Sequence, residues 1–180
     1  MNLIGLTGLP RSGKDTIAQR LIDMHGYTRF AFADPLKEAA ARLLGRPLWP
    51  MKGEHGFDRE AELPEWGFST RWFLQVFGTE CLRDQVRPDF WVQHMRNKIK
   101  LRPHARVVVT DVRFENEVDL IHEFGGLVAR VERPGAVGSA HVSDIEVSSD
   151  MRLYNSGGLD ELYKEADTLA WLNGDAHSKG

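Results

Sequence analysis

Two glycines and a lysine near the start of the chain have the spacing of a phosphate-binding loop. Residues 8–14 read GLPRSGK, which fits the pattern G-x-x-x-x-G-K. In such a loop, backbone N–H groups wrap a phosphate at a helix N-terminus, and glycine lets the backbone approach closely. The lysine would reach the β- and γ-phosphates and neutralise charge in the transition state. We therefore predict that ATP is bound here, by Gly8, Arg11, Ser12, Gly13 and Lys14.

The two residues after the lysine depart from the usual pattern. Asp15 stands where Ser or Thr commonly ligates Mg²⁺, and the hydroxyl comes one place later, in Thr16. We include both residues in the predicted nucleotide site. Asp15 either holds a metal-bound water or favours the helix N-terminus electrostatically, and the sequence leaves both possibilities open.

A carboxylate and two arginines follow later predicted strands. Asp111 comes just after the run Val107-Val108-Val109, where a carboxylate can organise the hydration shell of Mg²⁺. The alternative is that Asp111 caps a helix that starts at residue 112. Arg113 and Arg133 are placed to contact the transferring phosphate, since arginine suits bidentate phosphate recognition. The alternative for both is a solvated surface group.

A second acidic and basic pair is expected near the phosphate acceptor. Asp34 and Lys37 follow the predicted second strand in the segment FADPLK, residues 32–37. The end of that strand lies on the same edge of the sheet as the phosphate loop, so we predict substrate contacts there. Asp34 can also be read as a helix N-cap with Pro35 at the first helical position, and both readings can hold together.

Alternating strands and helices must position these residues. Apolar runs predict strands at residues 3–6, 27–33, 106–110, 127–131 and 151–154. Helical spacing follows all of them except the run at 127–131, after which residues 135–149 show little period. The triple valine predicts a strand at the sheet centre, covered on both faces. The sequence therefore predicts an α/β, three-layer P-loop NTPase fold with a mostly parallel sheet and helices on both faces.

Composition limits the classes of function. A chain of 180 residues is the size of one domain, so we predict a single kinase domain over residues 1–180, with an irregular insertion at about 46–70. The formal net charge of −3 gives no global attraction for a nucleic-acid polymer. No apolar run is long enough to span a bilayer, so we expect no membrane partner and a soluble protein. The only cysteine, Cys81, suits a reducing cytosol, and we expect it to be buried.

Four segments together resemble the phage-type deoxynucleoside monophosphate kinases. They are residues 8–16, the segment FADPLK, the segment FGTE at 77–80 with Arg83, and TDVRFENE at 110–117. The resemblance implies that the chain phosphorylates a deoxynucleoside monophosphate with ATP, and that Mg²⁺ is held largely through water. It also implies a cytoplasmic location, or the host cytoplasm if a phage encodes the chain. It also implies that Thr16 faces the α-phosphate.

The same resemblance assigns further residues. It implies an acceptor site formed by Arg71, Gln75 and Arg83, a lid at about 134–149, and an adenine neighbour at Asn155. Trp72, Phe73, Phe77 and Trp91 are expected in the core because of their helical spacing. A monomer or a homodimer fits equally. The alternatives are a kinase of the same fold for phosphomevalonate or dephospho-coenzyme A, and a binding module that holds a nucleotide without transferring phosphate.

Overall fold

The computed structural model describes residues 2–45, 60–136 and 146–175, which form two compact units. The first unit combines Met1–Ala31 with Met95–Gly180, and the second is Phe32–His94. The strands are β1 Asn2–Thr7, β2 Thr28–Phe30, β3 Glu62–Leu63, β4 Phe68–Ser69, β5 Arg106–Val109, β6 Leu127–Glu132 and β7 Met151–Tyr154. The helices are α1 Lys14–His25, α2 Asp34–Leu43, α3 Thr70–Gln75, the π-helix η1 Val76–Val86, α4 Phe90–Lys100, α5 Glu115–Glu123 and α6 Leu159–Asp175. The single-domain organisation stays a prediction.

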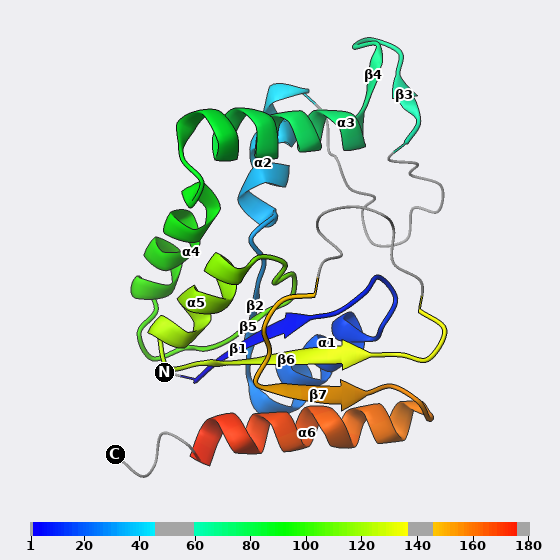
Figure 1. The fold of residues 1–180 in the computed structure, drawn as a ribbon, viewed down its shortest axis with the longest axis vertical. Helices are drawn as coiled ribbons and strands as arrows, with labels where there is room; N and C mark the ends of the chain where they lie inside the picture. The colour runs from blue at the N-terminus through cyan, green and yellow to red at the C-terminus, as the bar shows by residue number, and fades with distance from the viewer. Residues whose placement is uncertain (1, 46–59, 137–145, 176–180) are drawn as a thin grey trace. The chain divides into compact units, whose positions relative to one another are not determined.

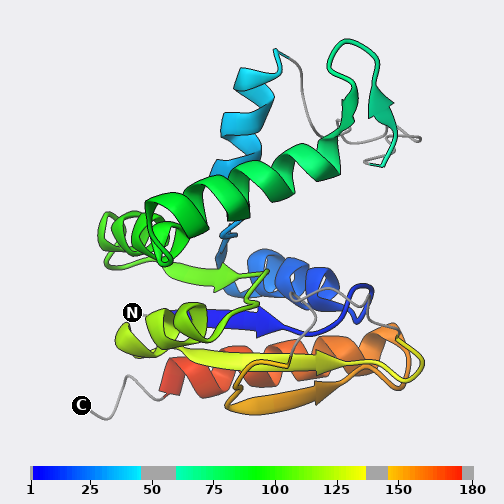
Figure 2. The same ribbon diagram turned by 45° about the horizontal axis from the view of Figure 1, so that its top comes forward.

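Five strands of the first unit form one parallel sheet in the order β2-β5-β1-β6-β7. Figure 2 shows β1, β5, β6 and β7 pointing the same way. This arrangement confirms the α/β fold expected from the sequence. The triple valine of β5 is fully buried, as predicted, but β5 lies between β2 and β1, and the central strand is β1.

Helices cover both faces of this sheet, and the alternation of side chains along β1 shows why. Ile4 and Leu6 belong to a core shared with buried residues of α1 and α6. The Cα of Gly5 faces the opposite side, where an added Cβ would lie 3.3 Å from Ile121 of α5. Successive strand residues point to opposite faces, so a strand buried on both sides must be apolar throughout. The helices α5 and α6 accordingly lie on opposite sides of the sheet (Figure 1).

The helices α1 and α6 are joined by an ionic contact at Asp167. Its carboxylate accepts two hydrogen bonds from Arg20, at 3.0 and 2.9 Å, and contacts Nε2 of His25 at 2.8 Å. These partners lower the pKa of Asp167 from the usual 3.8 to about 2, with the Arg20 hydrogen bonds as the largest cause and His25 second.

Replacing Asp167 with Asn should therefore change the acid dependence of stability. The folded pKa lies below the unfolded one, so the stabilisation is complete above about pH 4 and is lost as pH falls towards 2. Because the Asp167 side chain is 36% exposed, we expect a contribution of about 1 kcal/mol or less. Urea unfolding of both proteins between pH 2 and 6 measures it. A difference between them that does not shrink on acidification would contradict this assignment.

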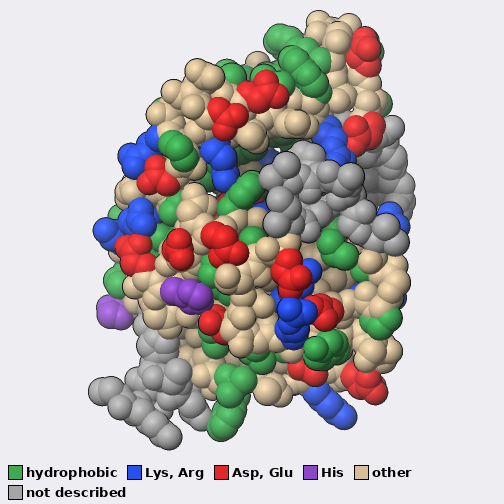
Figure 3. Space-filling model, in the orientation of Figure 1, with side chains coloured by type: hydrophobic (Ala, Val, Ile, Leu, Met, Phe, Trp, Pro, Cys, Tyr) green, Lys and Arg blue, Asp and Glu red, His purple; other side chains and the backbone are tan. Residues whose placement is uncertain are grey.

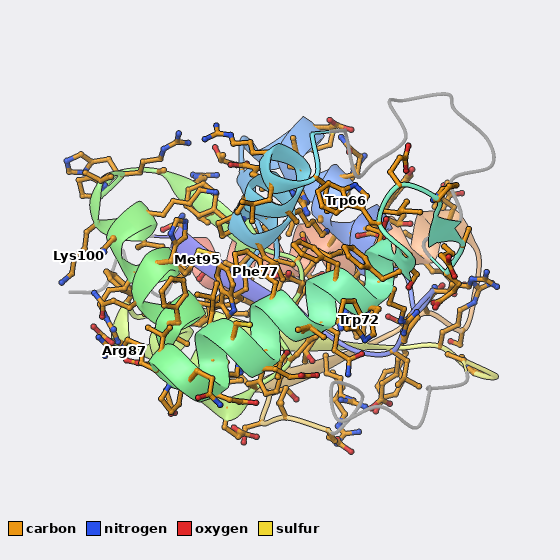
Figure 4. The ribbon with its side chains drawn as sticks, turned by 90° about the horizontal axis from the view of Figure 1, so that it is seen from above. Trp66, Trp72, Phe77, Arg87, Met95 and Lys100 are labelled. Carbon is orange, nitrogen blue, oxygen red and sulfur yellow. The ribbon has the colours of Figure 1, made fainter. Side chains whose placement is uncertain are left out.

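The second unit contains a continuous helical stretch, α3 and η1, packed on α2 (Figure 4). Gly78 of η1 permits this packing, since an added Cβ would lie 2.5 Å from Cδ2 of Leu36. The Gly78 carbonyl also accepts a hydrogen bond of 3.0 Å from the indole N–H of Trp91. A side chain at position 78 would therefore force Leu36 of α2 to shift.

Several expectations for this unit were wrong. Residues 60–69, within the insertion expected to be irregular, contain the antiparallel hairpin β3–β4, and residues 46–59 lie outside the described residues. Trp72 is 52% exposed rather than buried, with its ring centroid 5.2 Å from that of Phe68. Cys81 is exposed on η1, although burial was expected. Trp91 is buried, as predicted.

Candidate nucleotide-binding site

The loop between β1 and α1 has a backbone that requires its glycines. Gly8 and Gly13 have φ angles of 132° and 111°, and Arg11 has a φ angle of 61° in the left-handed region. A Cβ added to Gly8 would lie 2.3 Å from the backbone oxygen of Val131, at the end of β6. The loop therefore presses directly on the neighbouring strand, which only glycine permits at this point.

Lys14, the first residue of α1, is held against this loop. Its Nζ donates to the carbonyl oxygens of Gly8 at 2.5 Å and Leu9 at 2.7 Å, and it lies 3.5 Å from Oγ of Ser12. Ser12 is completely buried. The positive charge is thus placed among the carbonyl groups of the loop at the N-terminus of a helix, where anions are favoured.

A pocket of about 490 Å³ opens over the loop, and all of its lining belongs to the first unit. Seven of the nucleotide-site residues predicted from the sequence line it, and Arg133, predicted as catalytic, lies there too. The lining residues are Arg11, Ser12, Gly13, Lys14, Asp15, Thr16, Arg133, Asn155, Gly157, Gly158, Leu159 and Leu162. Gly8 is not in the lining and instead packs the loop against Val131 of β6. The volume suits a small organic ligand.

Asp111 and Arg113 follow β5 at the same edge of the sheet, outside the lining of this pocket. The backbone around Asp111 is fixed to both neighbouring strands, because Thr110 N–H bonds to Phe30 of β2 and Val112 N–H bonds to Leu6 of β1. The residue after Asp111, Val112, is therefore bonded to β1, the strand that leads into the phosphate loop.

The alternative reading of Asp111 as a helix cap is wrong. The helix α5 begins at Glu115, and its start is organised by Glu117 instead. The Glu117 carboxylate, 2% exposed, accepts hydrogen bonds from the N–H groups of Arg113 at 2.8 Å and Phe114 at 3.3 Å. Glu117 fixes the backbone that carries Arg113, and sequence reasoning gave it no such role. The signal available was an acidic residue in the first turn of a helix.

The residues predicted for the acceptor belong to the second unit. They are Asp34 and Lys37 of α2, Arg71 and Gln75 of α3, and Arg83 of η1. The side chain of Arg71 donates a 2.7 Å hydrogen bond to Glu60. The helix α2 starts at Asp34, so Ala33 is the N-cap rather than Asp34, and Pro35 lies at the second helical position. Their roles stay predictions.

A cluster of four charged residues at the edge of the sheet includes one residue, Glu146, of the segment predicted as a lid. Arg152 donates to Glu132 and, at 2.7 Å, to Glu146. Arg130 lies 3.3 Å from Glu132, a contact that brings the charges together without hydrogen-bond geometry. Of the predicted lid, residues 137–145 lie outside the described residues. On the face drawn in Figure 3, acidic and basic side chains are interspersed.

Within the described residues, no group of three or more His, Cys, Asp or Glu side chains is arranged to hold a metal ion. Two carboxylates, Asp15 at the start of α1 and Asp111 after β5, lie at the ligand edge of the sheet. Such a sparse set fits Mg²⁺, which keeps several waters and takes further ligands from substrate phosphates. None of the described helices combines the length and the hydropathy that a bilayer span requires.

Comparison with known proteins identifies the family. Residues 59–166 match the family model of deoxynucleotide monophosphate kinases. A protein of Acanthamoeba polyphaga mimivirus described as a deoxynucleotide monophosphate kinase is 36% identical, over 92% of this chain and 94% of that protein. This chain belongs to the deoxynucleotide monophosphate kinase family. A second member of the family, the deoxynucleoside-5'-monophosphate kinase of Escherichia phage T5, is 27% identical over 67% of this chain and 72% of that protein.

Solved structures share the fold of this deoxynucleotide monophosphate kinase family member. Shikimate kinase from Aquifex aeolicus aligns with a TM-score of 0.54 at 13% identity, covering 97% of this chain and 98% of that one. Dephospho-CoA kinase from Campylobacter jejuni also aligns with a TM-score of 0.54, at 15% identity and the same coverage. Similarity at these low sequence identities shows the P-loop kinase fold only. The identity of the phosphate acceptor has to be argued from the family relationship.

Proposed function

We propose that this chain transfers the γ-phosphoryl group of ATP to the phosphate of a deoxynucleoside monophosphate. The observation that carries the proposal is a lysine held within a glycine loop at a helix N-terminus, in a member of the deoxynucleotide monophosphate kinase family. Backbone N–H groups and a partly buried cation at one point can bind a phosphoryl group and stabilise it during transfer.

The donor half of the reaction is assigned to the first unit. Lys14 would release its loop carbonyls in favour of the β- and γ-phosphates, and Arg133, in the lining of the same pocket, would neutralise charge on the transferring group. Arg113 is proposed to assist from the turn that Glu117 holds. Mg²⁺ bound with ATP would offset phosphate charge, and Asp111 and Asp15 would orient its waters.

The acceptor half is assigned to the second unit. Arg83 and Arg71 would pair with the acceptor phosphate, and Gln75 would offer its amide to the base. Asp34 and Lys37, at the start of α2, would contact the same acceptor. The attacking atom is a phosphate oxygen that is already anionic. No strong general base is needed, so the reaction depends on positioning and charge stabilisation.

A panel of acceptors tests this function. ADP release would be measured with ATP and Mg²⁺ in the presence of each deoxynucleoside monophosphate, each ribonucleotide, phosphomevalonate and dephospho-coenzyme A. We expect at least one deoxynucleoside monophosphate to exceed phosphomevalonate and dephospho-coenzyme A in kcat/KM by about 10³-fold or more, because buried polar groups left unpaired penalise the wrong ligand. Preference for phosphomevalonate or dephospho-coenzyme A would reject the assigned substrate. Nucleotide binding without ADP release from any acceptor would indicate a binding module.

A further inference from the structure

Asn155, the first residue after β7, makes a side-chain contact with the phosphate loop. Its Nδ2 donates a 2.8 Å hydrogen bond to the backbone oxygen of Ser12. Its own backbone N–H donates a 2.7 Å hydrogen bond to the oxygen of Glu132 at the end of β6. Asn155 thus connects the sheet to the middle of the loop, and this contact spans 143 residues of sequence.

We propose that Asn155 is a positioning residue that fixes the orientation of the Ser12–Gly13 peptide for phosphate binding. The C=O and N–H of one trans peptide point in opposite directions, so holding the Ser12 oxygen determines where the Gly13 N–H points. Among the described residues, the Gly13 N–H donates none of the hydrogen bonds found. It is therefore available to an anion at the start of α1.

The second glycine of the loop is matched to this contact. A Cβ on Gly13 would lie 2.7 Å from Nδ2 of Asn155 and 3.1 Å from Cδ2 of Leu162. The same position has a φ angle of 111°, which L side chains rarely adopt. Asn155 and Gly13 therefore pack closely against each other. If the Ser12–Gly13 peptide could rotate, its N–H would lose its alignment with a bound phosphate.

The family resemblance implied a different role for Asn155, as a neighbour of the adenine of ATP. A ligand that has phosphates but no nucleoside distinguishes the two roles. If Asn155 acts through the loop, its loss weakens binding of tripolyphosphate and ATP by the same factor. If Asn155 contacts adenine or the sugar, only ATP binding changes.

The test uses calorimetric dissociation constants for ATP and for tripolyphosphate, both with Mg²⁺. Asn155→Ala should weaken both ligands equally, by about 5- to 15-fold, the size expected for one hydrogen bond. Asn155→Asp should weaken both further, because a carboxylate oxygen would face the Ser12 oxygen. The matched control is Ser156→Ala, at an exposed neighbour outside the pocket lining, which should bind as the unmodified protein does.

In steady-state assays the KM for ATP should rise while the KM for the acceptor stays unchanged. A loss confined to ATP, or unchanged binding of both ligands, would overturn the positioning role. Should Asn155→Ala fail to fold, the nearly isosteric Asn155→Asp carries the comparison. The inference rests on the proposed function, and different results would reject each of them. If the unmodified protein binds neither ligand, the phosphate site itself is rejected. If it binds both and substitution of Asn155 changes neither affinity, only the role of Asn155 is rejected.

Discussion

Lys14→Ala should lower kcat by about 10²- to 10³-fold, the range found when one preorganised group that stabilises transition-state charge is removed. The ammonium group lies within hydrogen-bonding distance of two loop carbonyls, where the β- and γ-phosphates are predicted to bind. Alanine removes the charge and should leave the fold intact. The measurement is steady-state kinetics with saturating ATP and acceptor, together with a thermal melt.

Lys164→Ala is the matched control for this variant. Lys164 is an exposed lysine on α6 and does not line the nucleotide pocket, so its removal should leave kcat unchanged. The melting temperatures of both variants should stay within a few degrees of the unmodified protein. Near-normal turnover in Lys14→Ala would refute the assignment of the loop as the phosphate site.

Gly8→Ala should destabilise the protein and abolish most nucleotide binding. The added Cβ would meet the Val131 oxygen at 2.3 Å, and the φ angle of 132° is unfavourable for any residue with a side chain. Backbone strain and overpacking together suggest a loss of about 3 kcal/mol, or a fall in melting temperature of roughly 6 to 12 °C for a chain of this size. The loop must move away from β6, so the affinity for ATP should fall with stability.

Gly174→Ala provides the comparison. Gly174 lies in α6, and nothing lies within 4 Å of the position of its added Cβ. Alanine there should be neutral or stabilising by up to about 1 kcal/mol, since glycine is unfavourable inside a helix. Equal melting temperatures for the two variants would show that the contact between Gly8 and Val131 does not constrain the loop.

Local sequence patterns were sufficient where a feature depends on neighbouring residues. The phosphate loop was predictable because the glycine and lysine spacing is itself the geometric requirement. The triple valine correctly indicated a strand buried on both faces, since a short, continuous run of β-branched apolar residues is typical of such a strand. Parallel pairing then followed from the alternation of strands with helices.

Features set by distant contacts were missed. The bond from Asn155 to Ser12 joins positions that no local pattern relates. Burial of Glu117 was hidden for the same reason, because a glutamate in a first turn is usually solvated. Trp72 was assigned to the core from its helical spacing with Phe73 and Phe77, yet helical period does not show which neighbouring surface is present to cover a side chain.

The exposure of Cys81 has a practical use. It is the only thiol in the 180-residue chain, and it lies on η1, two positions before Arg83. A maleimide dye would consequently attach to one defined place in the second unit, without any engineered substitution. The fluorescence of that single reporter would follow acceptor binding in real time, separately from events at the glycine loop.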